Sequence, residues 1–171
     1  MKRVKKLNHS YKPFEKWDWR SFGNPRKKIS VDEFVAQNIN NSVFYIATDS
    51  QNYSKKKTCV FTTAIIVHYM GEDGIGAGGR AIIHTDKVSY MESLRQRLLM
   101  EAFRSLEAAW YTDKIIPEDN VITVQLDVNK NLKFKSAKYH EELVGLVIAQ
   151  GFKCATKPDA WGASSVADKK C

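Results

Sequence analysis

Hydrophobic and polar positions along the chain follow two periodicities, one typical of strands and one typical of helices. Apolar, β-branched and aromatic runs bounded by turn residues predict five strands, at residues 43–48, 58–68, 80–84, 121–127 and 151–157. Helical spacing of apolar residues predicts a long helix that starts near Ser89 and a second helix over about 136–150. Ser30, with Glu33 three positions later, predicts a short capped helix, and a further helix is expected at the end of the chain.

The order of these elements indicates the fold class. Three strands in succession are typical of antiparallel hairpins, whereas the later alternation of strands and helices is typical of parallel crossovers. We therefore expect an α/β protein with a mixed five-stranded sheet and helices on both faces. The glycine-rich stretch "GEDGIGAGG" (71–79) is followed by no GK[ST] motif, so it predicts a hairpin tip rather than a phosphate-binding loop. The buried face of the long helix is expected to consist of its apolar positions, namely Leu98, Leu99, Ala102, Phe103, Leu106, Ala109 and Trp110.

Positive charge is concentrated at the N-terminus. The formal net charge is +8, and residues 1–28 hold ten Lys or Arg against Glu15 and Asp18, while the remaining 143 residues hold 17 basic and 17 acidic side chains. We therefore divide the chain into a basic, aromatic-rich arm (1–29) and one folded domain (30–171). Five aromatic residues are interleaved with the charges of the arm: Tyr11, Phe14, Trp17, Trp19 and Phe22. We favour docking of most of these rings on the domain, with contact to nucleic-acid phosphates as an additional role of the arm.

Cysteine usage and hydropathy exclude several classes of protein. Cys59, Cys154 and Cys171 are widely spaced and form no CxxC pair, which argues against a disulfide framework or a zinc site and fits a reducing compartment. No apolar stretch approaches about 18 residues, and the N-terminus has no apolar signal core. We expect a soluble, cytoplasmic protein with no membrane partner. Ser50, Ser164 and Ser165 lie in no nucleophile elbow, so serine hydrolysis finds little support.

Two of the predicted strands end in an aspartate. "IATDS" places Asp49 after the first strand and "QLDVN" places Asp127 after the fourth. Parallel strands would bring both carboxylates to the same edge of the sheet, although aspartate at a strand end is also common turn chemistry. The long helix and the terminal segment each offer two more candidates: Glu92 or Glu101, and Asp159 or Asp168.

A carboxylate cluster of this kind predicts a metal site. Clustered carboxylates repel each other unless a cation neutralises them, and hard oxygen ligands select Mg²⁺ or Mn²⁺. Two such ions about 3.5–4 Å apart would activate a water and stabilise the leaving oxygen of a phosphodiester. Asp49, Asp127 and a third carboxylate should then converge within metal-bridging distance. Four lysines follow Asp127 and form either a nucleic-acid-binding patch or a solvated surface: Lys130, Lys133, Lys135 and Lys138.

Four motifs in these segments together resemble a known family. They are "TDSQ", "SLRQRLLMEAFRSLEAA", "LDVN" and "KPDAWGASSVAD", of which the last is the most specific. Over about residues 30–170 the sequence resembles the YkuK-like family of predicted nucleases, a branch of the ribonuclease H-like superfamily. The resemblance implies a ribonuclease H fold and metal-dependent hydrolysis of phosphodiester bonds.

The resemblance also implies which acids form the site. The first-strand and fourth-strand aspartates of the superfamily match Asp49 and Asp127. For the helix glutamate we favour Glu101, which lies about two turns beyond the usual position. The alternative, Glu92, is explained by a capping box with Ser89.

The last acid of the site comes from the terminal segment. "SSVAD" favours Asp168, whereas Asp159 follows Pro158 and either caps the terminal helix or reaches the metal ions. Only three residues follow Asp168 in the sequence, so this ligand is the least supported of the four.

Two functions remain open on these grounds. The first is a nuclease that uses two Mg²⁺ or Mn²⁺ ions, and the second is a non-catalytic nucleic-acid-binding module on the same fold. Asp49→Asn distinguishes them, because it should abolish cleavage in the first case and preserve binding in the second.

Overall fold

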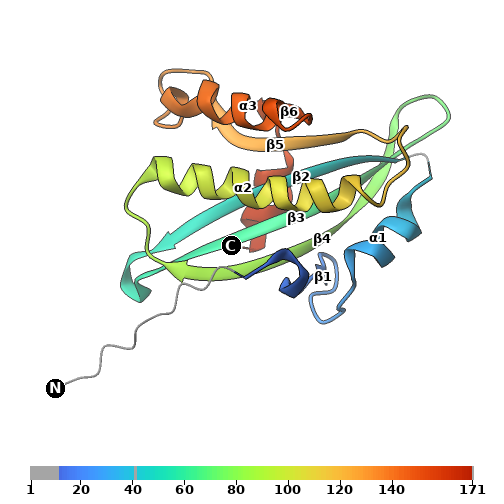
Figure 1. Ribbon diagram of the computed structural model, residues 1–171, viewed down its shortest axis with the longest axis horizontal. Helices are drawn as coiled ribbons and strands as arrows, with labels where there is room; N and C mark the ends of the chain where they lie inside the picture. Colours follow the sequence, from blue (N-terminus) through green and yellow to red (C-terminus); the bar gives the residue numbers. More distant parts are fainter. Residues whose placement is uncertain (1–11, 41, 171) are drawn as a thin grey trace.

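The computed structural model describes residues 12–40 and 42–170, apart from the side chains of residues 163, 164 and 170. The described residues form a six-stranded sheet with the strand order β1-β4-β3-β2-β5-β6 (Figure 1). The strands are β1 (Arg20–Ser21), β2 (Ser42–Tyr53), β3 (Thr58–Met70), β4 (Gly76–Ser89), β5 (Ile122–Asn129) and β6 (Lys153–Lys157). The helices are α1 (Val31–Asn38), α2 (Leu94–Asp113) and α3 (His140–Ala149), with short helical turns at Phe14–Lys16, Ser54–Lys56, Ala137–Tyr139, Ala163–Ala167 and Asp168–Lys170.

The strand directions confirm the mixed α/β sheet. β2, β3 and β4 are antiparallel neighbours, whereas β5 pairs in parallel with both β2 and β6. The predicted count of five strands is wrong, because the N-terminal arm contributes β1, whose Arg20 and Ser21 pair with Ile83 and Ile82 of β4. A strand of two residues is too short to produce a periodic pattern in the sequence.

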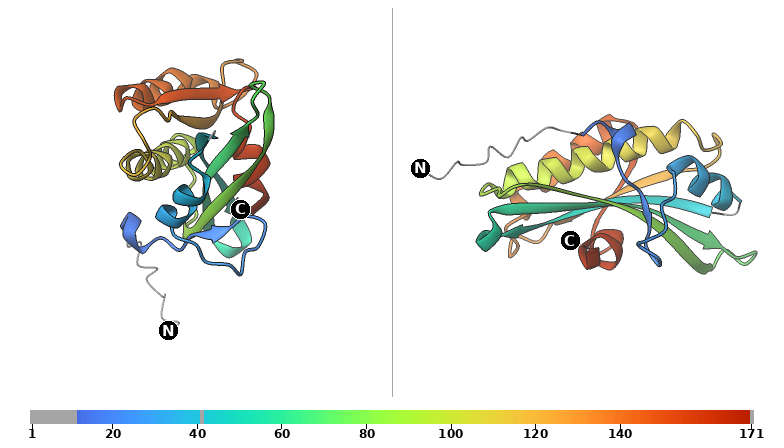
Figure 2. Two further views of the ribbon diagram at one scale, coloured as in Figure 1. Left: turned by 90° about the vertical axis from the view of Figure 1, so that its right-hand side faces the viewer. Right: turned by 90° about the horizontal axis from the view of Figure 1, so that it is seen from below.

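The two faces of the sheet are covered by different elements. α1, α2 and α3 lie on one face, and the last helical turns of the chain lie on the other, as the two rotated views show (Figure 2). Side chains alternate between the faces along each strand. On β3, Ile65 and Val67 join the large core beneath the helices, whereas Ala64 and Ile66 pack with Val166 of the terminal turns. Helices on both faces were expected, and the structure has them.

The long helix begins later than the sequence predicts. Ser89 is the last residue of β4 and pairs with Thr58, so it is not the N-cap of α2 that the predicted capping box with Glu92 requires. The helix cap is instead Ser93, whose side chain accepts a hydrogen bond from the Gln96 N–H at 3.2 Å. The capped start of α1 at Ser30 is confirmed, since its hydroxyl accepts from the Glu33 N–H.

The buried stripe of α2 is more polar than expected. Leu98, Ala102, Leu106 and Ala109 are buried as predicted, but the predicted core positions Phe103 and Trp110 are 46% and 39% exposed. Three polar side chains take their place against the sheet: Glu101, Arg104 and Ser105. Arg104 forms a bidentate ion pair with Asp86 of β4, and its guanidinium lies over the Phe61 ring. Polar groups that have hydrogen-bond or ion-pair partners can be buried. A prediction from apolar residues alone therefore misplaced one side of the buried face of α2.

The described part of the arm docks on the domain. Trp17 and Trp19 are buried in the main core, Phe14 packs against it, and Phe22 packs on the opposite face. Docking of the aromatic residues is thereby confirmed for these four rings, while Tyr11 lies outside the described residues. The division of the chain after residue 29 stays a prediction.

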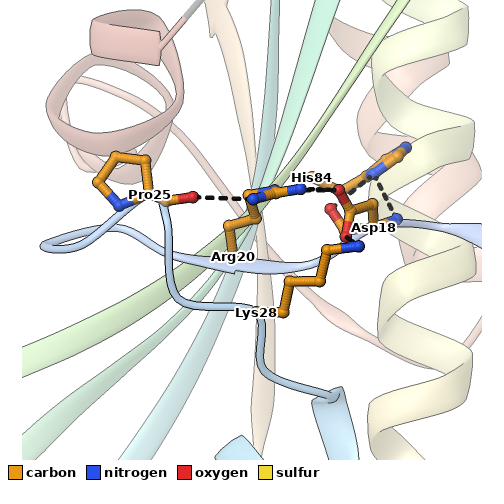
Figure 3. Close-up of polar contacts among 5 residues, drawn as sticks. All are labelled: Asp18, Arg20, Pro25, Lys28 and His84. Carbon is orange, nitrogen blue, oxygen red and sulfur yellow. Dashed lines mark hydrogen bonds and ion pairs between the residues drawn. The ribbon is translucent and has the colours of Figure 1, made fainter.

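Some of the charged side chains of the arm form ion pairs with one another. Asp18 accepts two hydrogen bonds from Arg20 and pairs with Lys28 at 3.4 Å, while the other end of the Arg20 guanidinium donates to the Pro25 carbonyl (Figure 3). The Asp18 N–H donates to Nδ1 of His84, a buried histidine that also stacks on Trp17. His84 therefore has a structural role, because its ring connects the arm to β4. In the described part of the chain, no helix has the length and apolar character needed to span a membrane.

Candidate active site

The candidate site lies where β2 and β5 stop pairing. Their parallel ladder runs from Phe44 and Ile122 to its last pair, Ala47 and Gln125. Asp49 and Asp127 are each two residues beyond that last pair, so the sequence spacing brings them to the same edge. In α/β sheets, the carboxyl ends of parallel strands are the usual place for ligand binding.

Both aspartates point to the face that carries the terminal turns. On β2, Thr48 contacts Ser105 of α2, and Ser50 donates to Glu101 of α2 at 2.5 Å. Asp49 lies between these two residues and therefore points the opposite way. On β5, Gln125 accepts a 2.6 Å hydrogen bond from the Gly162 N–H of the terminal segment. Asp127 is two residues further along β5 and belongs to that same face.

Asp127 lies in a β-bulge of β5. The pairing of β5 with β6 jumps from Leu126–Thr156 to Asn129–Lys157, which leaves Asp127 and Val128 without strand partners on β6. Bulges are common next to active sites, because they redirect a side chain and interrupt the ladder. Lys157 ends β6, and its Nζ forms an ion pair with Oδ1 of Asp127. Lys157 could not be identified from the sequence, because only the strand register brings it beside Asp127.

The terminal turns bring a third aspartate to the edge. Asp168 is exposed and lies close enough to Asp49 to share a hydrogen bond with it. The preceding residue, Ala167, is fully buried against the sheet. Gly162 fixes the path of the segment, since a Cβ at this position would lie 2.4 Å from Oε1 of Gln125. Only glycine fits this close approach without a shift of the neighbouring atoms.

Mutual repulsion and burial raise the pKa values at this edge. Burial is the largest cause that raises the pKa of Asp49 to about 7, and the negative charges of Asp127 and Asp168 raise it further. Burial also raises the pKa of Glu101 to about 8, against the lowering effect of the Ser50 hydrogen bond, with Asp49 and Asp127 as smaller raising influences. Several carboxyl groups are therefore gathered here, and their oxygen atoms are donors of the type that Mg²⁺ and Mn²⁺ prefer.

The acids do not form a closed metal-binding group. Among the described residues, no three His, Cys, Asp or Glu side chains lie close enough together to hold one metal ion. The expected convergence within metal-bridging distance is thus not met. Two of the acids have other partners, Lys157 for Asp127 and Ser50 for Glu101, and Glu101 approaches from the helix side of β2. The donor chemistry fits a divalent cation, but binding would require these side chains to rearrange.

The remaining candidate acids are both exposed at the surface. Glu92 is exposed in the segment before α2, and Asp159 is exposed in the turn after β6, where its N–H donates to the Thr156 carbonyl at 2.9 Å. The structure thus places Glu101, rather than Glu92, in electrostatic contact with Asp49 and Asp127.

The lysines after Asp127 form an exposed segment beside the edge. All four lie between β5 and α3 and are exposed: Lys130, Lys133, Lys135 and Lys138. Leu132 and Phe134 between them are 90% and 54% exposed. Exposed cations interleaved with an exposed aromatic ring are typical of a nucleic-acid contact surface.

Comparison with known proteins supports the fold and the class of function. The family model described as Ribonuclease H-like matches residues 28–171. The chain therefore belongs to the ribonuclease H-like family, as the resemblance of its motifs implied, and this membership suggests a function related to nucleic acids. No match was found among curated proteins or among solved structures.

Proposed function

We propose that the protein is a divalent-metal-dependent nuclease that hydrolyses phosphodiester bonds of nucleic acid. The observation that carries this proposal is the position of Asp49 and Asp127, two residues past the last pair of two parallel strands, with Asp168 against Asp49. Membership in the ribonuclease H-like family adds independent support.

The aspartates would hold the metal ions. Asp49 interacts electrostatically with both Asp127 and Asp168, so it is the candidate for a shared ligand. Glu101 would complete the set from α2, where Ser50 orients its carboxylate. Mg²⁺ or Mn²⁺ ions, two in this proposal, would activate the attacking water and stabilise the leaving oxygen.

The protein supplies a rigid frame for these ligands. Asp49 is paired with Thr62 of β3, which fixes the backbone of β2 behind its carboxylate. With a pKa of about 7, Asp49 exchanges its proton near neutral pH, and a bound cation would favour its ionised form. The exposed lysines after β5 would hold the phosphate backbone and orient the scissile bond.

A second candidate function is a nucleic-acid-binding module that does not cleave. The ion pair between Lys157 and Asp127 favours it, because an ammonium already neutralises one proposed metal ligand. In this case the lysine segment and the basic arm would provide the affinity, and the acids would have no catalytic role.

Cleavage of a labelled panel of nucleic acids tests the proposal. Single-stranded and duplex DNA, single-stranded RNA, an RNA–DNA hybrid and a four-way junction are incubated with Mg²⁺ or Mn²⁺. We expect metal-dependent cutting of at least one substrate, and a loss of at least about 100-fold in Asp49→Asn. Asp119→Asn is the matched control, since Asp119 is exposed in the loop before β5. A panel that is bound but never cut would favour the binding module.

A further inference from the structure

Asp49, Asp127 and Asp168 together form what we call the carboxylate edge of the sheet. Lys157 contributes a positive charge within this edge. Its side chain is 38% exposed and that of Asp127 is 22% exposed, so water screens their ion pair only in part. The bulge at Asp127 and Val128 brings Lys157 level with Asn129, so that its ammonium reaches back to Asp127. This contact depends on the sheet register and is not an accident of two flexible surface side chains.

We propose that Lys157 is a built-in counter-ion of the carboxylate edge and competes with a divalent cation for Asp127. The inference rests on the proposed function, because it assumes that the edge binds metal ions. Nζ of Lys157 takes up an oxygen of Asp127 that a metal ion would use. A divalent cation must therefore displace the ammonium or bind beside a like charge, and either event weakens its binding.

The competition gives Lys157 two opposite effects. Its charge relieves the repulsion among Asp49, Asp127 and Asp168, so the edge tolerates its carboxylates when no cation is bound. The same charge lowers the affinity for the metal ion, so Lys157 raises the ion concentration at which the site fills. If the ion pair of Lys157 only stabilised the fold, removal of the Lys157 charge would leave the affinity for the metal ion unchanged.

Binding of Mn²⁺ to the intact protein tests this role without an activity assay. Bound ion is counted from the loss of the electron paramagnetic resonance signal of free Mn²⁺. Lys157→Met and Lys157→Gln remove the charge and should each bind Mn²⁺ about tenfold more tightly than the wild type, while Lys157→Arg should stay within about threefold of it. Lys153→Met is the matched control, because Lys153 is an exposed lysine at the start of the same strand and should leave binding unchanged.

The outcomes separate this inference from the proposed function. If the neutral variants bind Mn²⁺ no more tightly than the wild type, while Asp127→Asn abolishes binding, the counter-ion role is wrong and the metal site stands. If neither the wild type nor the neutral variants bind Mn²⁺ at millimolar concentration, the metal site is wrong and the inference falls with it. Tighter binding in Lys153→Met as well would also overturn it, since the effect would then come from net charge alone. Circular dichroism on every variant shows that the fold is retained.

Discussion

The helix-covered face of the sheet and the face beneath the terminal turns differ in what they bury. On the helix face, β2 contributes Phe44 and Ile46 to a continuous apolar core, and even its polar positions Thr48 and Ser50 are bonded to α2. On the other face, a much smaller apolar cluster packs against the terminal turns, and this face also carries Asp49 and Asp127. Stability therefore depends mainly on the first face, and the proposed chemistry on the second.

The largest effect should come from a cavity on the helix face. Phe44 is fully buried, and Phe44→Ala should lower the free energy of unfolding by about 3–5 kcal/mol, because it removes apolar contact and leaves a void. Its neighbour Tyr45 is half-buried on the other face against the edge of Trp161, and Tyr45→Ala should cost about 1–2 kcal/mol. Urea unfolding of both variants measures the difference. Equal losses would show that the two faces contribute alike.

A methyl group at Gly162 should disturb the second face specifically. In Gly162→Ala the new Cβ would meet Gln125 and Ile66, so we expect a loss of about 1–3 kcal/mol in stability. The terminal turns would move with it, and cleavage should fall further than the loss of stability explains because Asp168 shifts. Gly145→Ala is the control: nothing lies within 4 Å of its Cβ position, and in α3 alanine should stabilise by about 0.5–1 kcal/mol. Unchanged cleavage in folded Gly162→Ala would remove Asp168 from the site.

The carboxylate edge should also make stability depend on pH. The pKa of Asp49 is raised from 3.8 to about 7, so between these values the folded protein holds more protons than the unfolded chain. Stability in a chelating buffer should therefore fall as pH rises from about 4 to 7, by about 1–2 kcal/mol after allowance for screening. Glu101, raised from 4.5 to about 8, acts in the same direction.

Asp49→Asn tests the origin of this slope. The amide carries no charge to bury, so the variant should be more stable than the wild type at pH 8 and should lose part of the slope. Thermal unfolding at several pH values measures both effects, with Asp119→Asn as the exposed control. A variant with the full wild-type slope would assign the titration to other groups.

The sequence predicted the parts of this molecule that depend on local pattern. Asp49 and Asp127 were found because each follows an apolar run, and parallel strands bring such positions together. The strands themselves continue past them, β2 to Tyr53 and β5 to Asn129. β1 was missed because Arg20 and Ser21 are too few to show a period, and Phe103 was misplaced because buried Arg104 has a charged partner. Lys157 was missed because its contact with Asp127 arises from a bulge that only the strand register reveals. Local periodicity thus fixes which strands exist, whereas long-range register decides which charges meet.

The smallest expected effect concerns the lysines that follow β5 at the carboxylate edge. Lys133→Ala and Lys135→Ala should each weaken nucleic-acid binding a few-fold and lower the slope of log affinity against log salt by about 0.7–0.9, the loss of one phosphate contact. Lys114→Ala is the control, because Lys114 caps the far end of α2, away from the carboxylate edge. Fluorescence anisotropy at several salt concentrations measures the slopes. If Lys114→Ala lowers the slope as much as the other two, binding responds to net charge, and the nucleic acid has no preferred path along the carboxylate edge.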